Sequence, residues 1–169
     1  MEQVNINKLT TRYYAGIGSR ETPDNILTNM TEIAQYLDNQ DYILRSGGAK
    51  GADSAFSDWT LGCEIYIPWA GFNNITGIVG DSLPTYQQAR EFTLKVHPAP
   101  HRLSEGAIKL HTRNVFQVLG ADLNTPVDFI VCWTKDGKDT GGTGQAIRIA
   151  NMFEIPVYNL FNMEFTVGG

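Results

Sequence analysis

Three glycine-rich clusters are the residues of this chain best suited to chemistry, because each follows a short apolar run. They are residues 16–20 (GIGSR), 46–51 (SGGAKG) and 141–144 (GGTG). Glycine lets backbone amides approach an anion closely, and a helix that begins at such a turn adds a favourable partial positive charge. One glycine-rich turn is often only a turn, but three of them after strands predict a cradle for phosphate groups.

Charged side chains accompany the first two clusters. Arg20, Arg45 and Lys50 flank the glycines and could neutralise a phosphate, although Arg45 and Lys50 could equally be solvated. Asp53 falls in the first turn of the next expected helix, where a carboxylate can contact a ligand or simply favour the helix dipole. The chain has no GxxxxGK[ST] and no GxGxxG motif, which disfavours ATP hydrolysis and NAD-dependent hydride transfer. We expect no cofactor.

Two further segments complete the expected site. Arg113 and Asn114 lie in a helix expected over 104–119 and would face the strand ends if that helix caps the sheet, although an exposed arginine is an equal alternative. Trp69 precedes a glycine- and asparagine-rich loop and could stack on a base. The residues expected to contact the ligand are Gly16, Gly18, Ser19, Arg20, Ser46, Gly47, Gly48, Lys50, Asp53, Trp69, Arg113, Asn114, Gly141, Gly142, Thr143, Gly144 and Gln145.

Metal and thiol chemistry are both disfavoured. His97 and His101 bracket a Pro-Ala-Pro turn, but no carboxylate or cysteine stands at a matching spacing, so we expect no metal site. Cys63 and Cys132 lie far apart in apolar runs and form no CxxC motif. They are expected to be buried free thiols in a reducing compartment, with a catalytic cysteine as the less favoured alternative.

The elements that must position these residues alternate along the chain. Strands are expected at 13–18, 41–45, 64–68, 127–133 and 155–160, and helices at 23–37, 49–61, 84–96, 104–119 and 141–152. Residues 127–133 are almost continuously apolar, which predicts a central strand that is buried on both faces. Residues 70–82 are expected to form a long surface loop. The alternation predicts the α/β class, as a single Rossmann-like three-layer domain with a mainly parallel sheet.

The length and the net charge of the chain limit the number of domains and the kinds of partner that we expect. The 169 residues indicate one domain, expected over 13–162, with an N-terminal extension at 1–12 and a tail at 163–169. The net charge of −5 argues against coating DNA by bulk electrostatics, so DNA is not expected as a partner, although a local basic pocket is compatible with this charge. No signal-peptide core or membrane segment is apparent, so we expect a cytoplasmic protein, and we expect a homo-oligomer.

The order of the motifs carries a family resemblance. The series YAGIGSRETP, ILRSGGAKGADSAF, EIYIPW, LHTRNVFQVLG and GGTGQAIRIA resembles the DNA-processing protein A (Smf/DprA-like) branch of the SLOG superfamily. It looks most like the small stand-alone versions encoded by bacteriophages, and it spans about residues 13–160. The resemblance implies a Rossmann-like fold that binds nucleotides, nucleotide-derived signals or nucleic acid.

The sister LOG ("lysine decarboxylase-like") branch implies cleavage of an N-glycosidic bond in a nucleoside monophosphate. Arg113 stands at the place of the arginine of that branch. The LOG turn P-G-G-x-G-T-x-x-E is altered here, because Thr140, Gln145 and Arg148 stand at its proline, threonine and glutamate. A cation cannot stabilise an oxocarbenium-like transition state or activate water as a base, so LOG-type hydrolysis is disfavoured.

The expected function is therefore binding of a phosphorylated nucleotide-derived small molecule, such as an ADP-ribose-like compound or a cyclic nucleotide signal. In a phage protein this would serve to sequester a host immune signal. The enzymatic alternative is a nucleotide N-glycosidase or phosphoribohydrolase that uses a different acid, such as Asp53 or Glu105. A second alternative is a DNA-processing or recombination accessory protein, which would need a basic groove.

Overall fold

A computed structural model describes residues 12–49, 51–58, 60 and 62–163 of the chain. Six strands form one sheet in the order β4-β3-β2-β1-β5-β6, and every neighbouring pair is parallel. The strands are β1 (Arg12–Ile17), β2 (Tyr42–Ser46), β3 (Cys63–Ile67), β4 (Ile78–Val79), β5 (Phe129–Cys132) and β6 (Val157–Asn159). This arrangement confirms the expected α/β class with a parallel sheet.

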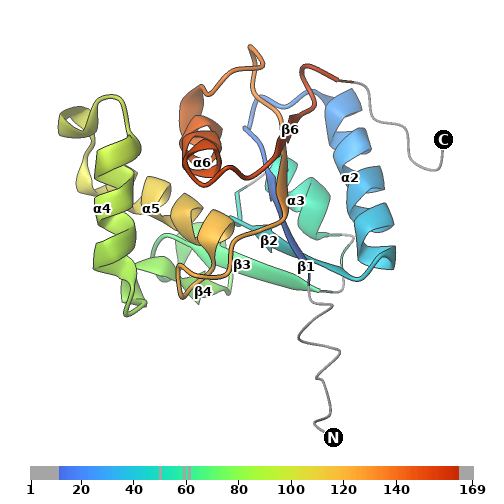
Figure 1. Ribbon diagram of the computed structural model, residues 1–169. Helices are drawn as coiled ribbons and strands as arrows, with labels where there is room; N and C mark the ends of the chain where they lie inside the picture. The colour runs from blue at the N-terminus through green and yellow to red at the C-terminus, as the bar shows by residue number, and fades with distance from the viewer. Residues whose placement is uncertain (1–11, 50, 59, 61, 164–169) are drawn as a thin grey trace, which may run out of the picture.

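Helices cover both faces of the sheet (Figure 1). Those described are α2 (Asp24–Asn39), α3 (Ala52–Ser57), α4 (Tyr86–Val96), α5 (Glu105–Leu119) and α6 (Gly141–Met152), with short 3₁₀ turns η1 (Phe72–Asn74), η2 (Gly80–Ser82) and η3 (Pro100–Arg102). Helices α2 and α3 pack on one face and α5 and α6 on the other, while α4 packs outside α5. The three layers are those that the sequence pattern predicts.

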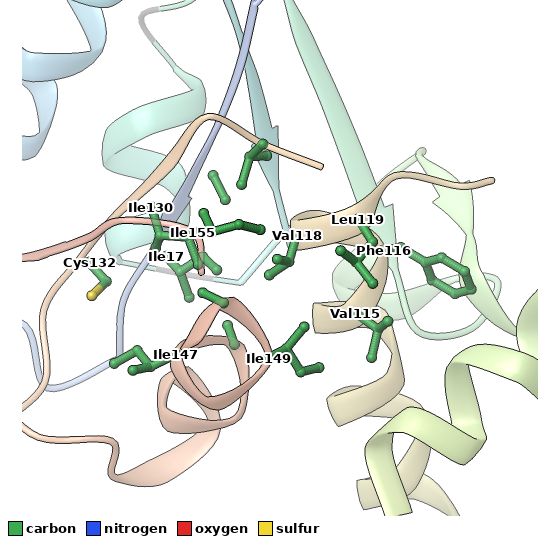
Figure 2. Packing of buried hydrophobic residues seen from close by; sticks show 14 of the residues in the cluster. Ile17, Val115, Phe116, Val118, Leu119, Ile130, Cys132, Ile147, Ile149 and Ile155 are labelled. Carbon is green, nitrogen blue, oxygen red and sulfur yellow. The ribbon is translucent and has the colours of Figure 1, made fainter. Parts of the chain in front are cut away.

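The two faces of the sheet have separate hydrophobic cores because successive residues of a strand point to opposite sides. Tyr14 of β1 packs in the core under α2 and α3, while its neighbour Ala15 packs in the core under α5 and α6. Figure 2 shows the second core, where Ile147 and Ile149 of α6 meet Val118 of α5 and the strand residues. The sheet is therefore anchored on both sides.

The observed elements differ from the expected ones mainly in the middle of the chain. Residues 127–133 do contain an interior parallel strand, β5, which lies between β1 and β6. Helix α3 is only 6 residues long, shorter than the expected 49–61. The segment 70–82, expected to be an unstructured loop, contains η1, η2 and strand β4. Strand β4 forms because its two residues pair with Tyr66 and Ile67 of β3, a contact that local sequence does not reveal.

Some expectations are not tested by this structure. It holds one chain, so the homo-oligomer stays a prediction, as do the domain limits of 13–162. Within the part of the chain that is described, no helix combines the length and the apolar character needed to cross a membrane.

Arg45 is a structural residue of β2. Its side chain is 2% exposed, its Nε donates to Oε1 of Glu64 at 3.0 Å, and its Nη1 donates to the carbonyl oxygen of Thr125. Its guanidinium carbon also lies 4.1 Å from the ring centroid of Tyr13. Because these contacts lie inside the protein, Arg45 joins β2 to β3, β1 and the segment before β5 rather than facing a phosphate.

We predict that Arg45→Leu destabilises the fold by about 1–3 kcal/mol, because it removes the donor of the Thr125 carbonyl and the cation beside the partly exposed Glu64. Urea unfolding would measure the loss. The matched control is Arg102→Leu, at an exposed arginine, which we expect to change stability by less than about 0.5 kcal/mol. Equal effects of the two substitutions would contradict the structural role of Arg45.

Candidate functional site

The candidate site lies where the strand order reverses. Strand β1 pairs with β2 on one side and with β5 on the other. The chain leaves the carboxyl end of β1 toward α2 on one face of the sheet, and it leaves the carboxyl end of β5 toward α6 on the other face. In open parallel sheets, ligands bind in the crevice at this switch point. Two cavities are found there, and they share Gly142 and Thr143 at the start of α6.

The inner cavity has a volume of about 270 Å³ and the outer cavity about 500 Å³. The inner cavity is lined by Ile17, Gly18, Ala49, Asp53, Ala107, Leu110, His111, Arg113, Asn114, Gln117, Gly142 and Thr143. The outer cavity is lined by Ser19, Arg20, Glu21, Thr134, Lys135, Thr140, Gly141, Gly142 and Thr143. Because they share two lining residues, the cavities are neighbours on either side of the start of α6.

A buried chain of hydrogen bonds ties the two sides of the site together. The Nη1 of Arg113 donates to the carbonyl oxygen of Gly47, in the turn after β2, and its Nε donates to Oδ1 of Asn114 at 3.0 Å. The Nδ2 of Asn114 in turn donates to the carbonyl oxygen of Gly142 at 2.9 Å. Helix α5 therefore fixes the turn after β2 and the start of α6 relative to each other.

Asp53 is the acidic group of the inner cavity. It is 4% exposed, and its Oδ2 accepts a hydrogen bond from the Ala49 amide at 3.0 Å. Burial raises the pKa of this carboxyl to about 6, while the nearby Arg113 guanidinium and the backbone amides of residues 49, 47 and 18 oppose the rise. Burial also lowers the pKa of Arg113 from its usual value, and Asp53 opposes that change.

The start of α6 offers backbone donors to the outer cavity. The cap residue Thr140 makes no side-chain hydrogen bond to the helix, because its hydroxyl donates to Oδ1 of Asp136. The first amides of a helix have no partner inside it and carry a partial positive charge. A Cβ added at Gly141 or Gly142 would meet no atom within 4 Å, so the backbone here is open to a ligand.

Two exposed cations stand beside these amides. Arg20 follows β1, Lys135 follows β5, and both line the outer cavity together with the Ser19 hydroxyl. The Ser19 side chain also accepts a hydrogen bond from the Glu21 amide at 2.8 Å, which holds this turn in shape. An anion at the start of α6 would thus meet backbone amides, a hydroxyl and two positive charges, with the carboxylate of Glu21 as the one acidic group in the lining.

The other predicted glycines serve packing more than ligand contact. A Cβ at Gly16 would lie 2.6 Å from the Phe56 ring, and one at Gly47 would lie 2.8 Å from Arg113. At Gly144 a Cβ would collide with the backbone of Asp139. Gly48 has a φ of +69°, which other residues rarely adopt. None of these four glycines is among the residues that line the two cavities.

Four more predicted residues lie away from the cavities or outside the described chain. Ser46 is fully buried at the end of β2. Trp69 packs edge-on against Phe72 with ring centroids 5.4 Å apart. Gln145 is fully buried, and its amide donates to the carbonyl oxygen of Thr93 at 3.1 Å. Lys50 lies outside the described residues. Their role as ligand contacts stays a prediction.

Arg148, the residue at the position of the LOG glutamate, is engaged within the protein. Its Nη1 donates to the carbonyl oxygen of Asp139 at 2.8 Å, and its Nη2 donates to Oε1 of Gln145 at 2.9 Å. Arg148 does not line either cavity. These hydrogen bonds connect α6 to the turn that precedes it.

Sequence reasoning missed several lining residues, among them Leu110, His111, Gln117 and Lys135. Leu110, Arg113, Asn114 and Gln117 are spaced i, i+3, i+4 and i+7, so they lie on one face of α5. Once Arg113 is placed in the site, this spacing would have identified Leu110 and Gln117. The contribution of Lys135 depends on where the turn after β5 folds, which spacing does not give.

The histidines and cysteines of the described chain do not form a cluster that would suit a metal ion, and neither thiol is activated. His97 lies beside His111, with ring centroids 5.1 Å apart, and burial, with the positive charges nearby, lowers the pKa of His111 to about 4. No group of three or more histidine, cysteine or acidic side chains is gathered among the described residues.

The two cysteines of the chain are both free thiols; Cys132 is buried and Cys63 is partly buried. Burial raises their pKa values to about 12 and about 11, which keeps both protonated.

Comparison with known proteins identifies a related fold. No protein-family model matches the sequence, and no curated protein shows a significant match. The structure is similar to that of DNA processing protein A from Helicobacter pylori, a protein described as having a unique single-stranded DNA binding mode. The TM-score is 0.61 at 14% sequence identity, and the match covers 98% of this chain and 71% of that one. This likeness establishes a Rossmann-like fold of the same kind.

The comparison bears on two expectations. The resemblance to DNA-processing protein A is confirmed at the level of the fold, while the SLOG superfamily and the phage type stay predictions. The expectation that DNA is not a partner is wrong, because a protein of the same fold binds single-stranded DNA. It rested on the net charge of −5, which averages over the whole surface and overlooks the two cations gathered at the outer cavity.

We predict a pH-dependent difference in stability between the wild type and Asp53→Asn. The folded protein binds the Asp53 proton with a pKa of about 6, against about 3.9 in the unfolded chain. Between these values the folded state holds more protons, so its free energy of unfolding falls as the pH rises. The wild type should lose about 2 kcal/mol relative to Asp53→Asn from pH 4 to pH 7.

Urea unfolding at pH 4, 5, 6 and 7 would measure this difference. The titration of His111 is common to both proteins and cancels in the comparison. Parallel stability curves for the two proteins would show that Asp53 ionises in the folded protein as it does in the unfolded chain.

Proposed function

We propose that this chain binds single-stranded DNA through phosphate groups held at the start of α6. The observation that carries the proposal is the pair of neighbouring cavities that share Gly142 and Thr143, the outer one lined by Arg20 and Lys135. Two neighbouring cavities suit a ligand with a repeating backbone. The fold it shares with a single-stranded DNA-binding protein supports the same assignment.

The outer cavity suits a phosphate. Free amides at a helix start favour negative charge, and Gly141 and Gly142 place no side chain over these amides. Arg20 and Lys135 add positive charge from the turns after β1 and β5. A local cluster of this kind binds nucleic acid backbone even when the whole protein is acidic, because charges beyond about 10 Å are largely screened at moderate salt.

A single strand suits this site better than a duplex. The inner cavity has a volume of about 270 Å³, just below the roughly 300–1,000 Å³ of pockets for drug-sized ligands. It therefore suits one part of a nucleotide, which can enter only if the base is unstacked and unpaired. Single-stranded nucleic acid presents such bases, whereas a duplex holds them in its stack.

A second candidate is a free nucleotide-derived small molecule, and the small volume of the inner cavity is the observation that favours it. A nucleotide or an ADP-ribose-like compound would place its phosphate in the outer cavity in the same way. Sequestration of a signal, as the phage resemblance implies, requires that such a ligand be bound tightly and released intact when the protein is denatured. Release of free base over many turnovers would instead indicate the N-glycosidase alternative.

Fluorescence anisotropy with a labelled 20-nucleotide single strand, in competition with the duplex and with free nucleotides, would test the proposal. We expect the single strand to bind more tightly than either competitor. The double variant Arg20→Ala/Lys135→Ala should weaken binding at least tenfold. It should also reduce the slope of log affinity against log salt by about 1.4, because each lost phosphate contact removes about 0.7.

The matched control for that double variant is Lys138→Ala, in the same turn as Lys135 but outside the cavity lining. It should leave the salt slope unchanged. Preference for a free nucleotide over the single strand would favour the second candidate. Binding of neither ligand class by the wild type would refute the proposal.

A second prediction concerns Gly142. A valine at this position has space for its Cβ and projects into the shared part of the site, so Gly142→Val should reduce single-strand binding at least tenfold without loss of stability. Gly106→Val is a close control, because Gly106 is also the second residue of its helix and a Cβ there has no contact closer than 4.0 Å. Equal binding by the two variants would place the ligand elsewhere.

A further inference from the structure

Several residues that line the inner cavity carry buried polar atoms that have no hydrogen-bond partner in the protein. Among the described residues, six buried side-chain nitrogen or oxygen atoms have no hydrogen bond. Three of them, Oδ1 of Asp53, Nδ1 of His111 and Nε2 of Gln117, belong to residues that line the inner cavity. Buried polar groups are nearly always paired in folded proteins, so such a concentration in one cavity points to a ligand.

Two of these side chains are almost completely buried. Asp53 is 4% exposed and Gln117 is 1% exposed. They come from different elements, Asp53 from α3 and Gln117 from α5, and meet at the same cavity. A buried polar atom that stays unpaired costs stability. A ligand that pairs with these atoms would recover that cost.

The chemistry of the two groups restricts what the ligand can be. An ionised Asp53 carboxylate only accepts hydrogen bonds, whereas the Gln117 amide nitrogen only donates them. A phosphate offers acceptors and a negative charge, so it would be repelled by Asp53. The required group has both an N–H or O–H donor and an acceptor.

The apolar residues that line the cavity restrict the chemical class of the ligand further. Ile17, Ala49 and Leu110 contribute apolar surface, which suits the flat faces of an aromatic ring. A sugar hydroxyl would satisfy Asp53 but would gain little from these apolar walls. A nucleobase has apolar faces and carries both donor and acceptor atoms on one edge.

We infer that the inner cavity is a nucleobase-binding site in which Asp53 Oδ1 accepts a hydrogen bond from the edge of the base and Gln117 Nε2 donates one to it. This inference rests on the proposed function, which places the phosphate of the same strand in the outer cavity. The two cavities meet at Gly142 and Thr143, so one nucleotide spans them. Asp53 and Gln117 are thereby specificity-determining residues, and His111 supplies a third polar contact.

The test uses three single-stranded 12-nucleotide oligomers with the same number of phosphates. The first carries thymine, whose edge holds both an N–H donor and carbonyl acceptors. The second carries 2,4-difluorotoluene, which has the shape of thymine without its strong hydrogen-bonding groups. The third carries abasic sugars. We expect thymine to bind about tenfold more tightly than difluorotoluene, as loss of hydrogen bonds to buried groups implies, and the abasic strand to bind least.

Two variants separate base contact from phosphate contact. Gln117→Met keeps the size of the side chain and removes the unpaired amide, so the variant should fold at least as stably as the wild type. The ratio of its affinity for the thymine oligomer to its affinity for the difluorotoluene oligomer should fall toward one. Arg20→Ala should weaken all three oligomers by the same factor and leave that ratio unchanged.

The outcomes distinguish this inference from the proposed function. Equal affinity of the wild type for all three oligomers would overturn the base site while leaving phosphate binding in place. Absence of binding to any oligomer would overturn both. Comparing the affinities of the wild type for the three oligomers needs no variant. This comparison therefore tests the base-binding site even if Gln117→Met fails to fold.

Discussion

The buried guanidinium of Arg113 is the interaction on which the arrangement of the site depends. Through it the turn after β2, helix α5 and the start of α6 are joined in one hydrogen-bonded chain, from the Gly47 carbonyl to Asn114 and on to the Gly142 carbonyl. These segments come from both sides of the point where the strand order reverses. Because a buried cation needs partners that are fixed in place, Arg113 also fixes the shape of the inner cavity.

The glycine clusters divide into two physical roles around that centre. In the first two clusters, Gly16 and Gly47 allow a helix or a side chain to approach the backbone closely. At the start of α6, by contrast, Gly141 and Gly142 face open space. The same residue type therefore allows close packing in one place and leaves the backbone uncovered in another. Only the second arrangement leaves backbone amides open to an anion.

The charges of the site are separated in space in a way that matches the two halves of a nucleotide. The outer cavity is lined by two cations, Arg20 and Lys135, and one acid, Glu21, whereas the inner cavity is lined by one of each, Asp53 and Arg113. The balance of charge is therefore more positive at the outer cavity, where we propose that a phosphate binds. The overall charge of −5 conceals this separation, which is why it is a poor guide to whether nucleic acid binds.

The sequence by itself determined the class of fold and the edge of the sheet at which the candidate site lies. The apolar run 127–133 indicated a strand buried on both faces, and glycine clusters after strands come to one edge of a parallel sheet. It did not determine which of those residues face a ligand. Arg45 resembles a phosphate contact in sequence but forms an internal ion pair, while Lys135 became part of the site only through tertiary structure. The reason is physical: periodicity gives the face on which a side chain lies, but contacts between distant segments decide whether that face meets solvent, a cavity or another side chain.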